Sequence, residues 1–413
     1  MLYLAAILIV YVIFFSIQPT AIAKNVSIHG PFPPPTSVRE TFNLDPFYEQ
    51  WIDVEGLPVV ASAKVNPYAV KEAAWLIRQM VGHRQDILQA LAKNNVRFAV
   101  MAYSELTTDI PEHSDLQPDY YWDRRARGLG STPVRPAVSC GEENLLNYSG
   151  DPYSTENILV HEFAHAIHQM GLNTVDPDFD GRLEVMYNAA KEKGLWQNTY
   201  AITNKAEYWA EGTQSWFDTN RANDDQHNHV DTRDKLKAYD PTLAVLLAEV
   251  YGDADWRYTQ AVTRTHLSHL QGFNPEDSPK FAWPAELIEL TEFHQQLKDP
   301  NSDGDGRWIN LEEQDLNSLP SLKSGDDDTE TAILLVNGTE AEIAYYWVDS
   351  EGNEKSYGKV APDAFVNRQT YVGHIWLIKD VDGNNLAVFR AETETGRALV
   401  SAEPLSGRDG GDE

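Results

Sequence analysis

The stretch His161-Glu162-Phe163-Ala164-His165 decides how the chain folds around a site, because it has the pattern H-E-x-x-H. Two histidines four residues apart lie on one face of a helix, so both imidazoles can reach one metal ion. The glutamate beside the first histidine is then placed to take a proton from an attacking water. Apolar residues around this face predict a helix over 157–170. The motif alone leaves open that these are ordinary helix residues.

A zinc site used for hydrolysis has three protein ligands and one open position, so a third ligand must lie elsewhere in the chain. The best candidate lies in the stretch 204–211, where Asn204 is a good helix N-cap and Glu207 and Glu211 share one helical face. One carboxylate can bind the metal while the other accepts a hydrogen bond from a metal-binding histidine and so orients it. The alternative is a solvated acidic face, although two tryptophans in the same helix argue against full exposure.

The segment 200–211, downstream of the two histidines, resembles the active-site pattern of the anthrax lethal factor catalytic domain and its relatives, which are gluzincin zinc peptidases. The similarity extends over about 157–218 and rests, besides aromatics at 208 and 209, on Tyr200, Thr203, Asn204, Ala206, Glu207, Ala210 and Glu211.

The resemblance implies an α+β zincin-like metallopeptidase domain, which we expect over 45–262. It implies that Glu207 is the third zinc ligand beside His161 and His165, and that Glu162 is the general base. It also implies that Tyr200 donates a hydrogen bond to the oxyanion of the tetrahedral intermediate. Glu211 is then the carboxylate expected to orient a ligand.

The chain has 413 residues and a formal charge of −30, from 63 acidic and 33 basic side chains. We expect no nucleic-acid binding, because a phosphate-binding surface needs clustered lysine and arginine. An acidic surface is compatible with calcium binding, with cationic substrates or with a salty medium. This length predicts two or three domains.

Residues 1–23 have the features of a secretory signal peptide. The run from Leu2 to Ile17 is apolar or small and too short to span a bilayer comfortably, and an A-x-A cleavage signal follows at 21–23. We therefore expect a secreted protein with no stable membrane association after cleavage; the alternative is an uncleaved segment that anchors it. Glycosylation sequons, meaningful in a eukaryotic source, begin at Asn25, Asn147 and Asn337.

Inside the first domain, periodicity predicts a helix over 65–93 and alternation predicts a strand over 96–101. A shorter strand over 136–140 is expected at a sheet edge, where an extended peptide can pair with it. Cys140 is the only cysteine, so no intrachain disulfide forms, and we expect a small buried residue there. The polar segment 224–229 is expected as a loop near the cleft.

Two connectors are predicted, a proline-rich linker over 24–44 and a longer segment over 263–330. The second contains an Asp/Gly-rich stretch that resembles an EF-hand calcium loop, with a glycine at 306 for the sharp turn. A flexible linker is the alternative. The candidate Ca²⁺ ligands are Asn301, Asp303, Asp305 and Glu312.

Short alternating strands separated by turn signals predict an all-β sandwich over 331–403, followed by an acidic tail over 404–413. This stretch resembles the β domain of the von Hippel–Lindau tumour suppressor. In that family aromatic side chains hold a 4-hydroxyproline ring while Ser and His bond its hydroxyl. The resemblance implies walls and polar contacts from Trp347, Tyr357, Thr370, His374 and Trp376, with Thr370 replacing the family's serine.

These observations predict a secreted, zinc-dependent endopeptidase whose C-terminal domain directs it to hydroxyproline-containing protein or peptide substrates. One alternative is a catalytically inactive matrix- or hydroxyproline-binding protein. Another is a metal-stabilised scaffold in which a fourth protein ligand closes the site, and His168 is the residue to check.

Overall fold

The computed structural model describes residues 27–401, so the predicted signal peptide and acidic tail lie outside the described residues. The described chain forms two compact units. The first contains 27–116 and 125–282, and the second contains 117–124 and the residues from 283 onward. The boundary at 282/283 therefore divides the predicted connector 263–330 between the two units. No helix of the described residues is long and apolar enough to cross a membrane.

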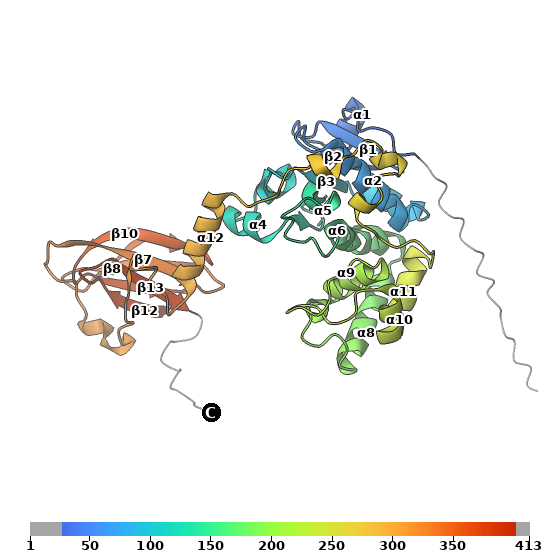
Figure 1. Cartoon of the computed structure of the whole chain (residues 1–413). Helices are drawn as coiled ribbons and strands as arrows, with labels where there is room; N and C mark the ends of the chain where they lie inside the picture. Colours follow the sequence, from blue (N-terminus) through green and yellow to red (C-terminus); the bar gives the residue numbers. More distant parts are fainter. Residues whose placement is uncertain (1–26, 402–413) are drawn as a thin grey trace, which may run out of the picture. The chain divides into compact units, whose positions relative to one another are not determined.

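The first unit is built on a five-stranded sheet in the order β1-β2-β3-β5-β4 (Figure 1). The strands are β1 (Gln50–Val54), β2 (Leu57–Ala61), β3 (Arg97–Met101), β4 (Gly128–Leu129) and β5 (Ala137–Gly141). Strands β2, β3 and β5 are mutually parallel, whereas β1 and β4 run antiparallel to their neighbours. The three parallel strands are buried along their whole length, as expected for a sheet covered on both faces.

Two expectations about this sheet are corrected. The strand expected at 136–140 is β5, which lies between β3 and β4 and is not an edge strand. The edge on this side of the sheet is the two-residue strand β4, whose Gly-Leu sequence gives no alternation signal, and β1 forms the opposite edge. The helix predicted over 65–93 is two helices, α2 (Pro67–Val81) and α3 (Gln85–Lys93), because the chain leaves helical geometry at Arg84, with φ −108° and ψ 67°.

The remaining helices of the first unit follow the sheet in sequence, apart from α1, which precedes it (Figure 1). Helix α6 packs against β5 and β4, and α9 packs against α6, so the second half of the unit is anchored to the sheet edge. Their bounds are α1 (Thr36–Phe42), α5 (Glu142–Leu145), α6 (Ile158–Ala166), a π-helical turn (Ile167–Leu172), α7 (Asn173–Val175), α8 (Phe179–Glu192), α9 (Lys205–Trp216), α10 (Arg233–Tyr239) and α11 (Pro241–Tyr251).

The described part of the predicted proline-rich linker is folded into the first unit. Phe42 and Leu44 are buried in a cluster with Tyr48 and with Val60 of the sheet, and Ile28 belongs to the main core. The linker prediction over 24–44 is therefore wrong for this part, because apolar residues between the prolines find partners far along the chain. Cys140 is fully buried, as predicted.

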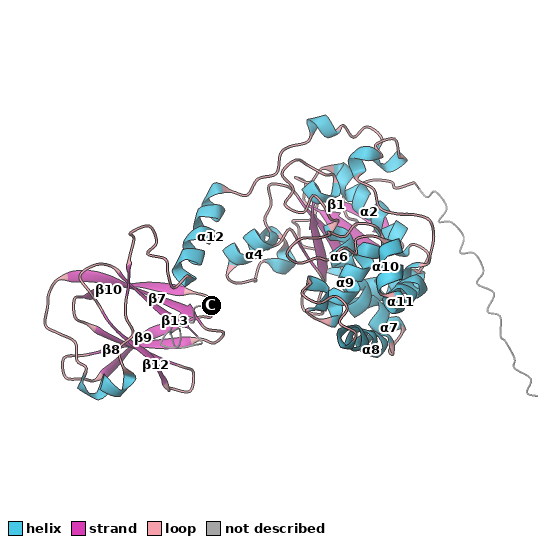
Figure 2. Cartoon of the chain, turned by 60° about the horizontal axis from the view of Figure 1, so that its bottom comes forward, coloured by secondary structure: helices cyan, strands magenta, loops and turns pink. Residues whose placement is uncertain are grey.

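The second unit contains residues 119–124 of helix α4 (Asp119–Arg125), helix α12 (Ala285–Lys298) and a β-rich region of two four-stranded sheets (Figure 2). Their orders are β10-β7-β13-β6 and β12-β11-β8-β9. The bounds are β6 (Ile309–Asn310), β7 (Glu330–Gly338), β8 (Ile343–Val348), β9 (Glu354–Val360), β10 (Phe365–Tyr371), β11 (Ile375–Lys379), β12 (Asn385–Arg390) and β13 (Gly396–Ser401).

One apolar core joins the two sheets, with Ile333 and Leu335 of β7 facing Tyr345 of β8 and Trp376 of β11. This arrangement agrees with the predicted sandwich. The sequon at Asn337 is not a glycosylation site in this fold. Its side chain is fully buried, and Nδ2 donates to the main-chain oxygens of Ala341, Val360 and Ala361.

Candidate metal centre

Two capped helices position the predicted ligands. Asn157 caps α6 by accepting a hydrogen bond from Val160 N, and Asn204 caps α9 by accepting hydrogen bonds from the main-chain N–H groups at 206 and 207. The buried Trp209 fixes the two helices against each other, because its Nε1 donates to Ala164 O at 3.0 Å. The helix that carries Glu207 is therefore tied to the middle of the H-E-x-x-H segment.

His161, His165 and Glu207 converge on one point, which confirms the predicted grouping. The two Nε2 atoms lie 3.2 Å apart, and Glu207 Oε2 lies 3.2 Å from His161 Nε2 and 3.4 Å from His165 Nε2. In a tetrahedral site with metal–ligand bonds of about 2.0–2.1 Å, neighbouring ligand atoms are about 3.3–3.4 Å apart. Within residues 27–401, this is the only group of three or more His, Cys, Asp or Glu side chains whose ligand atoms approach within 4.8 Å.

The charges around this group favour a cation. Burial alone would lower the pKa of His161, but contact with Glu207 and the charges of Glu162 and Glu211 raise that pKa well above its ordinary value. Burial would raise the pKa of Glu207, yet the two imidazoles hold it far below its ordinary range. Glu207 Oε2 is buried and makes no hydrogen bond. A buried acceptor of this kind, facing two imidazole nitrogens, fits a metal ligand.

The outer nitrogen of His161 has partners that hold the ring in place. Nδ1 lies 2.9 Å from Gln214 Oε1, an acceptor to which an Nδ1–H group can donate, and Nε2 is the nitrogen that faces the centre. Glu211, expected to orient a ligand, lies farther away, with Oε1 at 3.6 Å from Nδ1. Gln214 therefore takes the position nearest to the ring, and Glu211 adds negative charge beside it.

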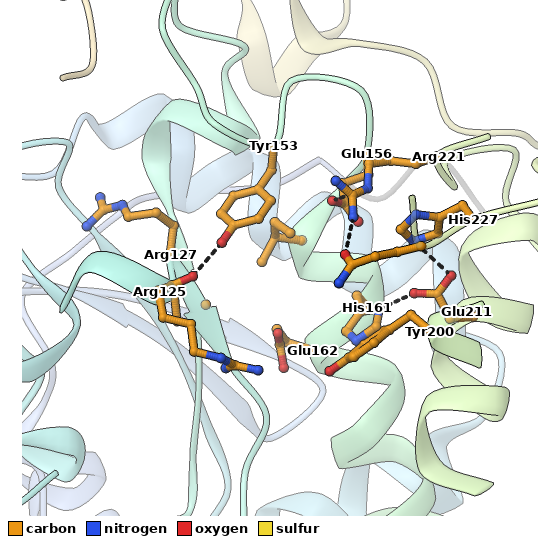
Figure 3. A pocket seen from close by; sticks show the side chains of 14 residues that line it. Arg125, Arg127, Tyr153, Glu156, His161, Glu162, Tyr200, Glu211, Arg221 and His227 are labelled. Carbon is orange, nitrogen blue, oxygen red and sulfur yellow. Dashed lines mark hydrogen bonds and ion pairs between the residues drawn. The ribbon is translucent and has the colours of Figure 1, made fainter. Parts of the chain in front are cut away.

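A chain of polar contacts extends from Glu211 into the loop after α9 (Figure 3). His227 Nε2 lies 3.3 Å from Glu211 Oε2, and His227 Nδ1 lies 2.7 Å from Asp224 Oδ1. The same loop holds Tyr200, whose main-chain N donates to Gln226 O at 2.7 Å. The sequence predicted a polar loop near the cleft at 224–229 but not that it contacts Glu211 and Tyr200.

Glu162 and Tyr200 both line a cavity of about 260 Å³ beside the three ligands (Figure 3). Burial raises the pKa of Glu162, partly offset by the two imidazoles. Burial and the charge of Glu207 raise the pKa of Tyr200 to about 12, so this phenol stays protonated. The Tyr200 ring stacks near His161, with ring centroids 6.4 Å apart. The structure thus brings both predicted catalytic residues to the metal centre.

The edge strand β4 passes close to α6 at Gly128, and the chain stays close to α6 at Gly130, the residue after the strand. A Cβ at Gly128 would lie 2.4 Å from Ile158 Cγ2 and 2.8 Å from Ser139 O. A Cβ at Gly130 would lie 3.0 Å from His165 Cβ. The Gly-Leu-Gly sequence is the signal that sequence analysis missed: it marks a close approach between a strand and the metal helix.

His168 does not close the centre. Its Nε2 lies 3.0 Å from Asp180 Oδ1, and it is not part of the convergent group. The scaffold alternative therefore loses its proposed fourth ligand.

The predicted calcium residues do not converge among the described residues. Asp303 Oδ1 accepts from Asp305 N, and Asn301 N donates to Asp299 Oδ1, so the segment forms local turns. Its aspartates and Glu312 belong to no group of three with ligand atoms within 4.8 Å. Calcium binding here stays a prediction.

The five residues predicted to bind hydroxyproline lie together in the second unit. Trp376 Nε1 donates to Thr370 Oγ1 at 3.0 Å, and Thr370 Oγ1 lies 3.2 Å from His374 Nδ1. The rings of Trp347 and His374 are 5.1 Å apart, as are those of Tyr357 and Trp376. Thr370 and Trp376 are each 2% exposed, whereas Tyr357 is 45% exposed. The two buried residues therefore support the surface that the other three form.

The comparisons with known proteins also distinguish the N-terminal region from the C-terminal β-rich region. A search of curated proteins gives no match to the chain. The family model described as "VHL beta domain" matches residues 322–394. The C-terminal β-rich region therefore matches the VHL beta domain over strands β7 to β12, and the N-terminal α+β region holds the convergent group of His161, His165 and Glu207.

Proposed function

We propose that the N-terminal region is a zinc-dependent endopeptidase of the gluzincin type, acting on protein or peptide substrates outside the cell. One observation carries the proposal: three ligand atoms converge beside a cavity that His161 lines together with the carboxylate of Glu162 and the protonated phenol of Tyr200. The extracellular location rests on the signal-peptide features of 1–23.

The roles of the side chains follow from their chemistry. A zinc ion held by the three ligands supplies a Lewis acid that lowers the pKa of water toward about 7 and polarises the scissile carbonyl. Glu162, made more basic by burial, accepts the proton of the attacking water and passes it to the leaving amine. Tyr200 donates a hydrogen bond where the oxyanion develops. The free side of β4 offers main-chain groups to an extended substrate.

Metal removal tests this proposal. We expect the zinc-loaded full chain to cleave a proteome-derived peptide library, a chelator to stop cleavage, and added zinc to restore it. Circular dichroism of the chelated protein serves as the control for folding. Stoichiometric zinc without turnover would support the inactive binding protein, and chelator-resistant cleavage would exclude the metal mechanism.

For the second unit we propose docking of hydroxyproline-containing segments at Trp347, Tyr357 and His374. The supporting observation is that Thr370 Oγ1, which accepts from Trp376 Nε1, lies 3.2 Å from His374 Nδ1 and so fixes the imidazole beside the ring of Trp347. Burial lowers the pKa of His374, so the imidazole is neutral at pH 7 and has one donor and one acceptor nitrogen. A ligand hydroxyl can bond to His374 Nε2, the ring nitrogen that Thr370 does not contact.

Calorimetry with matched hydroxyproline and proline peptides tests the docking site. We expect the full chain to favour hydroxyproline by roughly 10-fold, the value for one or two neutral hydrogen bonds. His374→Ala should abolish this preference, while Val381→Ala, an exposed change in the β11–β12 turn, should keep it. Equal affinity of the wild type for both peptides would contradict the proposal.

A further inference from the structure

The side-chain amide of Gln214 links the His161 ring to a carboxylate in the wall of the cavity. Gln214 is fully buried on α9, and its Oε1 lies 2.9 Å from His161 Nδ1. Its Nε2 donates a hydrogen bond to Glu156 Oε2 at 3.0 Å, and the main-chain oxygen of Asn157 lies 3.4 Å from the same nitrogen. Both ends of the amide are therefore engaged.

These partners allow one orientation of the Gln214 amide. Glu156 Oε2 and the oxygen of Asn157 only accept hydrogen bonds, so the amide nitrogen with its two N–H donors must face them. A flipped amide would place its oxygen against two other oxygens and lose these hydrogen bonds in a buried place. Gln214 Oε1 is therefore fixed opposite His161 Nδ1. Because an amide oxygen accepts only from a protonated nitrogen, Nδ1 carries the proton and the lone pair of Nε2 faces the convergent group.

The carboxylate that fixes the amide is itself held in place. The side chain of Glu156 is 7% exposed, and its Oε1 lies 3.2 Å from Arg221 Nε (Figure 3). Arg221 in turn donates through a terminal nitrogen to Gln226 Oε1 at 3.0 Å. A carboxylate buried to this degree needs a charge partner, and the guanidinium supplies it. The orientation of the amide therefore depends on a paired carboxylate outside the convergent group.

Glu211, the carboxylate expected to orient a ligand, is directed to other partners. Its Oε1 lies 3.6 Å from His161 Nδ1, which is beyond hydrogen-bonding distance. Its Oε2 accepts from Asn220 Nδ2 at 3.0 Å and lies 3.3 Å from His227 Nε2. The hydrogen bond that orients the His161 ring therefore comes from the neutral amide on the next turn of α9.

We propose that Gln214, held by Glu156, is the positioning residue that keeps the proton of His161 on Nδ1 and thereby sets how tightly the centre holds zinc. The inference rests on the zinc-binding part of the proposed function. A partner that accepts from the outer nitrogen of a histidine ligand orients the ring and raises its basicity. A neutral amide does this less strongly than a carboxylate, because charge-assisted hydrogen bonds are the stronger ones.

Zinc titration of the full chain against a competing chelator tests the proposal. Gln214→Met keeps the length of the side chain but has no oxygen, and it should lower zinc affinity by roughly 10- to 100-fold. Glu156→Gln combined with Gln214→Glu exchanges the amide and the carboxylate, so an oxygen again faces Nδ1 and an amide can donate to it. This exchange variant should bind zinc at least as tightly as the wild type. Gln89→Met, an exposed change on α3, is the matched control and should not alter the affinity.

A spectroscopic measurement on the wild type needs no change in this network. In long-range ¹H–¹⁵N spectra of the zinc-loaded, histidine-labelled chain, His161 should carry its proton on Nδ1 and the metal on Nε2, with its signal assigned by comparison with His161→Asn. Metal on Nδ1, unchanged affinity in Gln214→Met, or no recovery in the exchange variant would overturn the inference. Zinc binding without hydrolysis would contradict only the peptidase proposal, whereas a wild type that binds no zinc would contradict both.

Discussion

Replacing Glu162 by glutamine is expected to lower kcat for peptide hydrolysis by about 10²–10⁴-fold, the usual contribution of a positioned general base. Glutamine keeps the shape of the side chain but has no basic oxygen. Zinc content should not change, because the convergent ligand atoms come from His161, His165 and Glu207.

Hydrolysis rates and zinc stoichiometry of the same preparations check this prediction. Glu184→Gln is a suitable control, because it removes an exposed carboxylate that pairs with Lys205 on the surface. Full activity of Glu162→Gln would remove the base assignment. Loss of zinc from this variant would show instead that Glu162 is a ligand.

Replacing Glu207 by alanine is expected to weaken zinc binding by more than about 100-fold. Even the loss of a residue that only hydrogen-bonds to a metal ligand typically lowers metal affinity by about 10- to 100-fold. The change removes the only carboxylate of the convergent group, and the two imidazoles that remain cannot form a three-ligand site. Hydrolysis should be lost together with the metal.

Zinc titration against a competing chelator measures this effect, and thermal unfolding provides a second readout. Zinc at about 100 times its dissociation constant should stabilise the wild type by about 2.7 kcal/mol, and the same zinc concentration should stabilise the variant far less. Glu249→Gln, which breaks an exposed pair with Arg182, is the matched control. Unchanged zinc affinity in Glu207→Ala would show that the convergence does not represent a metal site.

The parts of the site that the sequence predicts are those set by local geometry. The spacing of His161 and His165 on one helix and the Asn204 cap before Glu207 depend on residues within one or two turns. Local geometry does not show that these two helices pack against each other. In the structure they do, and the hydrogen bond from Trp209 Nε1 to Ala164 O joins them.

The parts that the sequence does not predict depend on contacts between distant segments. Gln214 lies one turn beyond Glu211 on α9, yet only the packing of α9 on α6 shows that it reaches His161. His227 belongs to a polar loop with no periodic pattern. Gly128 and Leu129 form too short a strand for alternation to be visible, so an edge of the sheet was expected at 136–140.

The loop after α9 has a consequence for how this protein can change over generations. Gln226 anchors the main chain of Tyr200, and the adjacent His227 contacts Glu211 behind the His161 ring. A single insertion or deletion in this loop would therefore be expected to change both zinc affinity and the rate of hydrolysis. Mutational drift should be slower in this surface segment than in other exposed loops, although none of its residues belongs to the convergent ligand group.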